Sequence, residues 1–425
     1  MTGLLALTMI FPFTRKQLKN PFELVGRIDR EISERGRRLV IGIQLEPDFE
    51  ALSGALVIIE GNGKYLRGVR ADSCSVAIPK TTTLMLKNLQ LQEDLSLLDL
   101  NAVRTDLALL QQSIVANMKR DAGKYINRLL VTAISDPGFC QNSSKDLQIS
   151  ICDANLLAEL TGISVVSDFA LRDLAAGGNG QHLFALPAWL LFADRNQKIA
   201  RKDRLLVIVR DQIQSIYLPA SDGLDVELPD VKVWTSPGLS LLNQLTGWPS
   251  DKKAIAEYNV QGQLNTDFGD AIQAAIQNQE DFKFKEFEEL TMADRIRTGI
   301  VVVTNQITSQ IDGMGDTAKG IEIIVDCAPE LVGTFVNQLI RKIGEEQVRN
   351  DLATQGHPGQ IHAVLTAMLG AMSIDQMPAN VPWITGAKSQ RVLGRLTPGS
   401  PSNWRQLLCE MADFQPPAMR LRDAV

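Results

Sequence analysis

The chain has 425 residues, of which 45% are hydrophobic and 22% are charged, and its formal net charge is −6 at pH 7. This length allows two or three domains with sizeable cores. The acidic balance provides no basic face, so neither nucleic acid nor an anionic membrane is an expected partner. Five cysteines without CxxC spacing favour reduced thiols and a cytoplasmic location over a disulfide framework, and no metal site is expected.

Residues 1–37 begin with an apolar run that is too short to cross a bilayer, and we interpret them as an N-terminal extension. From Arg38 to Ile78, apolar runs separated by Gly61-Asn62-Gly63 predict antiparallel strands joined by a hairpin. The three- and four-residue spacing of apolar residues from Leu86 to Arg128 predicts one or two amphipathic helices. A buried strand is predicted at 129–134.

Residues 149–192 predict a strand, a helix, a second strand, a Gly-rich turn and a final helix at 183–192. The charged stretch 194–203 is the predicted boundary between two halves, because strands and crossover helices restart beyond it. Strands are predicted at 205–211, 214–220, 231–234 and 321–327, and helices at 239–245, 267–277, 291–311 and 331–344. The predicted domains are therefore residues 38–200 and 201–400, followed by a tail, 401–425, with a short helix around Trp404.

The stretch Ile149–Phe192 resembles the central signature of the anhydro-N-acetylmuramic acid kinases, which are sugar kinases of cell-wall recycling. A second stretch, Met377–Pro398, is similar to the closing pattern of the same family. The resemblance implies an α/β fold of the two-lobed, actin-like ATPase or ribonuclease H-like type, with duplicated domains around a central cleft. It also implies a homodimer, and an anhydro-amino sugar as a possible ligand.

The family pattern DFRxxDxAxGGxG is matched by Asp168, Phe169, Asp173 and the glycines that follow, although Ala170 stands where the family has Arg. The resemblance implies that this loop lies beside the sugar, and Asp136 stands where the family has its HGQT sugar-binding segment. The implied substrate-binding residues are Arg172, Gly177, Gly178, Asn179, Gly180 and Asp136. The alternative is structural, since paired glycines permit a tight turn with any ligand or none.

The segments that correspond to the phosphate loops have lost their small residues. The first reads Gln44-Leu45-Glu46-Pro47-Asp48-Phe49-Glu50, where three carboxylates would repel a triphosphate and a proline has no N–H. Arg210 and Asp211 replace the adjacent glycines of the second loop, and the third begins at Asp326. A kinase needs close approach of backbone N–H groups to phosphates, which these side chains oppose.

The family's general base is an aspartate in FDxGPGN, and the corresponding segment here, 233–239, places Trp234 at that position. Loss of a general base typically costs about 10²–10⁴ in rate. If nucleotide contacts persist, they involve Asp211, Asp326 and Gly238, and the candidate acids are Asp173 and Asp168. Both of these acids have a structural alternative, because a carboxylate at such a turn can cap a helix or accept backbone N–H groups.

We therefore expect a catalytically impaired relative, a pseudokinase with a binding, sensing or scaffold role linked to amino sugar recycling. The alternative is an active kinase that uses ATP and magnesium to phosphorylate the 6-hydroxyl of the anhydro sugar with ring opening. A hydrolase has little support, because no nucleophile–His–acid arrangement is visible in the sequence.

Overall fold

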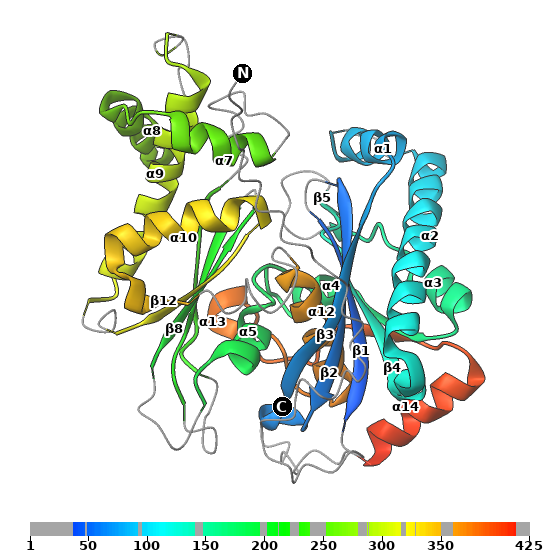
Figure 1. Ribbon diagram of the computed structural model, residues 1–425. Helices are drawn as coiled ribbons and strands as arrows, with labels where there is room; N and C mark the ends of the chain where they lie inside the picture. Colours follow the sequence, from blue (N-terminus) through cyan, green and yellow to red (C-terminus); the bar gives the residue numbers. More distant parts are fainter. Residues whose placement is uncertain are drawn as a thin grey trace, which may run out of the picture.

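The computed structural model describes residues 37–46, 49–91, 96–140, 148–195, 202–210, 212–221, 229–238, 252–278, 287, 289–315, 320–327, 329–349 and 360–413. These residues form two α/β lobes that stand side by side (Figure 1). Each lobe is built on one mixed β-sheet.

The sheet of the first lobe has the strand order β13-β7-β4-β1-β2-β3. Strands β1, β2 and β3 form an antiparallel meander, whereas β4 and β7 continue the sheet parallel to β1. The bounds are β1 (Arg38–Leu45), β2 (Ala51–Glu60), β3 (Arg67–Ala77), β4 (Leu129–Ser135), β7 (Ser164–Ser167) and β13 (Arg395–Thr397). A separate two-stranded ribbon, β5 (Phe139–Cys140) with β6 (Gln148–Ile149), follows β4.

The second sheet repeats this topology in the order β10-β9-β8-β11-β12. Its first three strands are again antiparallel neighbours, and β11 and β12 run parallel to β8. The bounds are β8 (Arg204–Val209), β9 (Gln212–Leu218), β10 (Lys232–Pro237), β11 (Glu322–Asp326) and β12 (Val348–Arg349). The repetition confirms the predicted duplicated, actin-like or ribonuclease H-like fold.

Side chains of β1 alternate between two cores, as the two-residue period of a strand requires. Leu39, Ile41 and Ile43 face a core shared with α1 (Lys80–Leu91), α2 (Leu97–Ala122) and α3 (Ala154–Thr161). Val40 faces the opposite core, which lies between the lobes. On that side Gly42 is needed, because a Cβ there would lie 1.9 Å from the carbonyl oxygen of Ala363.

The core between the lobes is centred on α12 (Ile361–Ile374), which is buried on most sides. This helix packs on β1, β2 and β4, and the same core includes Leu206 and Ile216 of the second sheet. Helices α4 (Phe169–Leu174), α5 (Ala185–Phe192) and α13 (Pro382–Thr385) complete the region around it. The two lobes thus share one continuous apolar cluster.

The position of the segment after residue 360 differs from the predicted division into domains. The sequence assigned residues up to 400 to the second lobe, but α12 packs on the first sheet and β13 pairs with β7. Helix α14 (Pro401–Asp413) contacts β4 and β7, and its Asn403 accepts hydrogen bonds from the backbone N–H and the hydroxyl of Ser164. The predicted helix around Trp404 is confirmed. Contacts between segments this far apart in the sequence leave no periodic pattern in either segment, so the sequence did not predict them.

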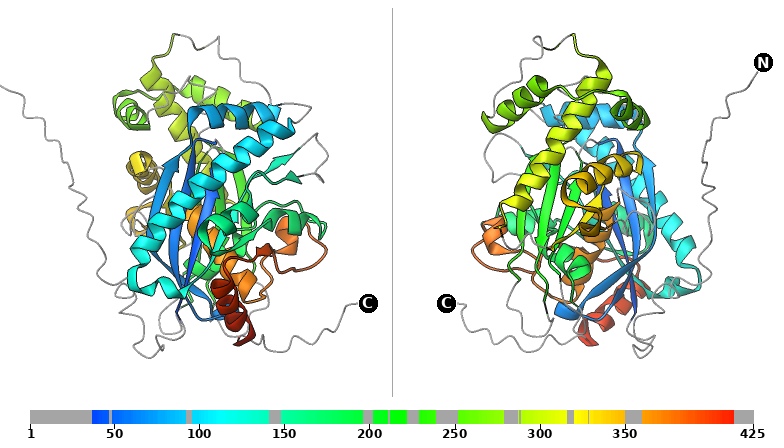
Figure 2. Two further views of the ribbon diagram at one scale, coloured as in Figure 1. Left: turned by 90° about the vertical axis from the view of Figure 1, so that its right-hand side faces the viewer. Right: turned by 60° about the vertical axis from the view of Figure 1, so that its left-hand side comes forward.

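The second lobe carries α7 (Lys252–Gln261), α8 (Thr266–Asn278), α9 (Met292–Asp312) and α10 (Pro329–Ile343), which pack on one another and close one side of its sheet. Figure 2 shows that α9 runs along this sheet while α2 runs along the first. The helix predicted at 239–245 lies outside the described residues.

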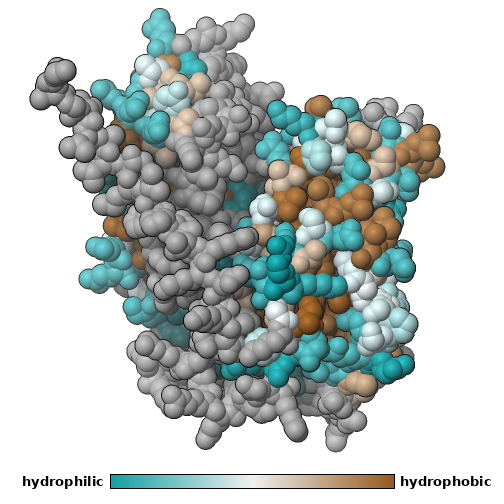
Figure 3. Space-filling model, turned by 45° about the vertical axis from the view of Figure 1, so that its right-hand side comes forward, coloured by the Kyte–Doolittle hydropathy of each residue, from teal (hydrophilic) through white to brown (hydrophobic). Residues whose placement is uncertain are grey.

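Hydrophobic side chains gather on the outer face of α1 and α2 (Figure 3), where Leu84, Leu97 and Leu98 are exposed. In the part of the chain that the structure describes, no helix is both long and apolar enough to span a membrane.

Candidate functional site

A pocket of about 250 Å³ opens where the two lobes meet. First-lobe strand ends supply one wall, the loop between α4 and α5 supplies the floor, and β9 and α12 supply the other wall. Among the described residues, it is lined by Gln44, Ser135, Asp136, Pro137, Gln148, Ser150, Asp168, Phe169, Ala170, Leu171, Gly180, His182, Leu183, Phe184, Gln214, His362 and Leu369.

Asp136 lies directly beyond the end of β4 and, like Asp168, lines the pocket. Its carboxyl group accepts three backbone hydrogen bonds, each 2.7 Å long, from the N–H groups of Gly138, Ile151 and Cys152. Burial raises the pKa of Asp136, and the three backbone donors oppose that shift because they favour the charged form. Asp136 therefore fixes the backbone that frames the pocket and has few acceptor positions left for a ligand.

Asp168 follows β7 and occupies the left-handed region, with φ 60° and ψ 33°. This conformation is uncommon outside glycine, although Asp and Asn tolerate it better than most residues. One carboxylate oxygen accepts the hydroxyl of Ser150 at 2.7 Å, and the other lies 3.1 Å from the guanidinium of Arg395. The turn thus holds a carboxylate at the pocket wall with a hydroxyl beside it.

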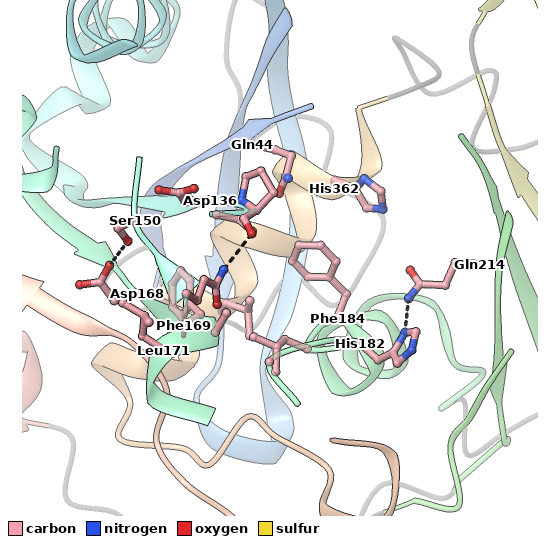
Figure 4. Close-up of a pocket in the computed structure, with 17 residues that line it drawn as sticks. Gln44, Asp136, Ser150, Asp168, Phe169, Leu171, His182, Phe184, Gln214 and His362 are labelled. Atoms are coloured by element: carbon pink, nitrogen blue, oxygen red, sulfur yellow. Dashed lines mark hydrogen bonds between the residues drawn. The ribbon is translucent and has the colours of Figure 1, made fainter. Parts of the chain in front are cut away.

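Nitrogen-bearing side chains line the opposite wall (Figure 4). The side-chain amide nitrogen of Gln214 is hydrogen-bonded to Nδ1 of His182 at 2.9 Å. Burial also lowers the pKa of His182. His362 stacks on Phe184 with ring centroids 5.3 Å apart, and burial together with the nearby charge of Arg210 lowers its pKa to about 3. Both imidazoles are therefore neutral at pH 7.

Asp173, the other candidate acid, is completely buried and does not line this pocket. Its carboxylate accepts the side-chain amide of Asn380 at 2.9 Å and the backbone N–H of Gly180 at 3.0 Å. A Cβ at Gly178 would lie 2.0 Å from a carboxylate oxygen of Asp173, so this glycine permits a close approach. Asp173 supports the Gly-rich loop, as in the structural alternative, and it is placed too deep to touch a ligand.

Of the implied substrate-binding residues, only Asp136 and Gly180 line the pocket. The other four do not line it: Arg172, Gly177 and Asn179 are exposed, and Gly178 is half-buried. The loop is instead bound to the second signature segment, because Asn179 N–H donates to Thr385 O at 2.8 Å and Lys388 N–H donates to Ala176 O at 3.1 Å. The two resembling stretches therefore form one structural unit beneath the pocket.

The positions that correspond to phosphate loops lie at the ends of β1, β8 and β11. Arg210, at the turn after β8, donates to the carboxylate of Asp326 at 2.6 Å and to the carbonyl of Val209 at 2.7 Å. Across the cleft, Glu46 accepts the hydroxyl of Ser53 at 2.7 Å. Burial by itself lowers the pKa of Arg210, but the nearby carboxylates of Asp326 and Glu46 favour the charged form, so the pKa is raised. Charged side chains paired with one another thus occupy the place of bare backbone amides.

The first of these turns is also filled by an aromatic residue. Phe49 has φ 59° and is 2% exposed, because its ring packs into the core beneath α1 and α2. Its N–H donates to Glu46 O at 2.9 Å, which closes the turn onto itself. A backbone N–H that is already bonded inside the turn is lost as a donor to phosphate.

Charged side chains, rather than small residues, stand at these strand ends. Two carboxylates and a paired guanidinium meet where phosphate oxygens would need free donors. The described residues contain no group of three His, Cys, Asp or Glu side chains suited to hold a metal ion.

The residue at the family's catalytic-aspartate position and the remaining predicted cofactor residues lie away from the described lining of the pocket. Trp234, at the aspartate position, lies within β10, opposite Ser215 of β9, and packs against the core of the second lobe. Gly238 follows that strand and is buried. Neither lines the pocket, and Asp211 lies outside the described residues.

Sequence reasoning did not select Gln44, His182, Gln214, Phe184 or His362 as site residues. One signal was available, since the chain has only 3 histidines and two of them meet in this pocket. Their proximity depends on α12 returning to the first lobe, which no local pattern indicates.

The family model and the relatives that match this chain carry the same name. Residues 41–202 match the family model described as anhydro-N-acetylmuramic acid kinase. The enzyme of that name from Nitrosomonas europaea is 23% identical over 303 residues, which cover 64% of this chain and 80% of the relative. The corresponding protein from Pseudomonas syringae pv. syringae is 28% identical over 268 residues, covering 60% and 71%. The match to the xylulose kinase structure from Rhodospirillum rubrum covers 89% of this chain and 97% of that one, at 11% identity and a TM-score of 0.36.

Proposed function

We propose that this chain, an anhydro-N-acetylmuramic acid kinase-like protein, binds a small sugar of the anhydro-amino class between its lobes without efficient phosphoryl transfer. The supporting observation is the ion pair between Arg210 and Asp326, which joins two strand ends where a kinase would need free backbone amides. The sugar side of the cleft, by contrast, retains an open pocket of about 250 Å³ with polar walls. One half of the cleft thus has a pocket that can bind a sugar, and the other half has an ion pair in the place of the amides needed for phosphoryl transfer.

The pocket can make the contacts that a sugar requires. Gln44 and Ser150 offer hydrogen bonds to hydroxyl groups, and Phe184 offers an apolar face to ring C–H groups. Asp168 could accept a proton from a ligand hydroxyl, but its two oxygens already bond Ser150 and Arg395.

The test is thermal unfolding with sugar and with ATP–magnesium in separate titrations. A ligand at 100 times its dissociation constant stabilises the folded state by about 2.7 kcal/mol. We expect stabilisation by an anhydro-amino sugar and none by ATP–magnesium. Stabilisation by ATP–magnesium together with ADP release that depends on the sugar would overturn the proposal.

An active kinase is the second candidate, and the position of Asp168 in the pocket wall favours it. In that case Asp168 is the general base, and Asp168→Asn should lower kcat by about 10²–10⁴. Glu159→Gln, which removes an exposed carboxylate on the same lobe, is the matched control and should leave kcat unchanged.

Two further parts of the proposal concern the setting of the protein. We infer a cytoplasmic location, in keeping with Cys74, Cys152, Cys327 and Cys409, which are thiols outside any disulfide. We also infer a homodimer, as the family resemblance implies. Sedimentation equilibrium should give about twice the chain mass of 46.7 kDa, whereas a value near the chain mass would contradict it.

A further inference from the structure

Large apolar side chains lie exposed on the outer face of the first lobe, where α1 packs against α2 (Figure 3). Leu97 and Leu98, in the first turn of α2, are 78% and 85% exposed, and Leu84 of α1 is 60% exposed. Leu109, about three turns further along α2, is 49% exposed. Leucines gathered on one exposed face are typical of a surface that binds protein.

The outward side of α2 continues this surface along the helix. Its exposed residues recur every three or four positions, as one side of a helix does, and they are uncharged over about 27 Å of helix. We call this stripe the α2 face, and it consists of Leu98, Ala102, Thr105, Leu109, Ser113 and Ala116. The solvent side of a surface helix ordinarily carries charged or polar residues. The α2 face is therefore suited to pack against another helix.

The α2 face is complementary in shape to a second copy of itself. A two-fold axis through its middle, at the level of residue 107, places Leu98 opposite the partner's Ala116. The same axis places Leu109 opposite the partner's Thr105. Each leucine then meets a small side chain, which allows the two helices to approach closely and their side chains to interdigitate.

Charges at the ends of α2 favour the antiparallel direction over the parallel one. The first turn carries Asp99, and the last turn carries Lys119 and Arg120. Asp121 offsets one of these two positive charges, and the other remains. Antiparallel pairing lays the first turn of each helix over the last turn of its partner, so that unlike charges meet and the helix dipoles oppose each other. Parallel pairing would instead bring Asp99 against the partner's Asp99.

We propose that the α2 face is the interface of a homodimer, in which α2 of one chain packs antiparallel against α2 of a second copy. This inference rests on the homodimer inferred above and names the surface that forms it. The pocket lies where the lobes meet, whereas α2 covers the opposite face of the first sheet. Sugar binding is therefore tested separately, and it stands or falls without this interface.

The first test is sedimentation equilibrium of the full chain and of single variants. Leu98→Lys and Leu109→Lys each bury two charges in the dimer because of its two-fold symmetry. Each should raise the dissociation constant of the dimer by at least about 10-fold. Val260→Lys is the matched control, since Val260 is 80% exposed on α7 of the second lobe, and it should leave the dissociation constant unchanged. Thermal unfolding of the three variants checks that each one is folded.

The second test, disulfide cross-linking, reports the direction of the helices. It uses a Cys409→Ser background, because Cys409 is an exposed thiol. Antiparallel pairing separates the two copies of Leu98 by about 27 Å along the helix axis but places Leu98 beside the partner's Ala116. A mixture of the Leu98→Cys and Ala116→Cys chains should therefore form a disulfide-linked dimer, whereas Leu98→Cys alone should not.

Each outcome supports or overturns the inference. A monomeric wild type would overturn both the homodimer and this interface, while sugar binding would still be judged by its own titrations. A dimer that is equally stable in Leu98→Lys and Leu109→Lys would place the interface elsewhere. Rapid cross-linking of Leu98→Cys with itself would show parallel pairing and contradict the arrangement. If the wild type is monomeric and both lysine variants unfold at lower temperature, another part of the same chain covers the face.

Discussion

The carboxylate of Asp173 accepts a hydrogen bond of 2.9 Å from the side-chain amide of Asn380, a residue 207 positions away in the chain. Asn380 in turn accepts the backbone N–H of Arg391 at 2.6 Å. Both Asp173 and Asn380 are fully buried. The two stretches that carry the family resemblance are thus held together by a buried pair, and the conserved-looking acid of the signature supports the loop.

Asp173→Asn should destabilise the fold. The substituted amide places an N–H₂ group against a donor, either Asn380 or the N–H of Gly180, and leaves a buried donor unsatisfied. We expect a loss of about 2–3 kcal/mol in the free energy of unfolding, measured by urea denaturation. Arg172→Gln, at the exposed neighbouring position, is the control and should change it by less than about 0.5 kcal/mol. Equal stability of Asp173→Asn and the wild type would contradict the structural role.

Gly178→Ala and Gly333→Ala should change stability in opposite directions. A Cβ at Gly178 would lie 2.0 Å from the Asp173 carboxylate, so the loop must shift and the variant should lose about 1–3 kcal/mol. Gly333 lies in α10, and a Cβ there meets nothing within 4 Å. Alanine should stabilise that helix by about 0.5–1 kcal/mol. Thermal unfolding of both variants, measured side by side, would reject the assignment if Gly178→Ala melted no lower than the wild type.

Arg210→Ala should destabilise the protein through its partner. The pair with Asp326 is largely buried, with side-chain exposures of 17% and 7%, and the substitution removes the guanidinium that is bonded to that carboxylate. A loss of about 2–4 kcal/mol is expected. The double variant Arg210→Ala/Asp326→Ala should recover part of this loss, because the carboxylate is removed together with the arginine that is bonded to it.

The control for the Arg210 cycle is Lys232→Ala. Its pair with Asp230 is exposed, at 55% and 73%, and should contribute less than about 1 kcal/mol. If the double variant loses as much stability as Arg210→Ala and Asp326→Ala lose together, Arg210 and Asp326 do not interact in solution.

His362 should make the fold less stable as the pH falls below neutrality. Its pKa is about 3 in the folded state, against 6.5 for a histidine exposed to water, so between these values the unfolded state binds one more proton. Stability contributed by the neutral ring is therefore present above pH 6.5 and is lost as the pH falls, by up to about 1.4 kcal/mol per pH unit. From pH 7 to pH 5 this residue should cost about 1–2 kcal/mol.

The measurement is urea unfolding of the wild type and of His362→Phe at both pH values. Phenylalanine keeps the stacking on Phe184 but does not titrate. The variant should lose about 1–2 kcal/mol less than the wild type over this range. Identical losses would mean that His362 is as free to protonate in the folded protein as in the unfolded chain.

The amino-acid sequence by itself determined the local structure of both lobes. Apolar residues fill successive positions of β1, with Leu39, Ile41 and Ile43 on one face and Val40 on the other, which is typical of a strand that has two buried faces. The spacing within α2 and α9 specifies amphipathic helices. Such patterns depend on the period of a single element, so they can be recognised without knowledge of the partner. The order of strands and helices, repeated in two halves, then indicated the fold.

Tertiary structure alone decided which polar residues form the site. His362 reaches the pocket because α12 returns from the second half of the chain to pack on β1, where Gly42 allows the close approach. Asp173 and Asp168 stand five positions apart and look alike in the sequence, yet one is enclosed beneath the loop and the other lines the cavity. Burial and charge environment arise from contacts between distant segments, and the spacing of residues along one segment carries no record of them.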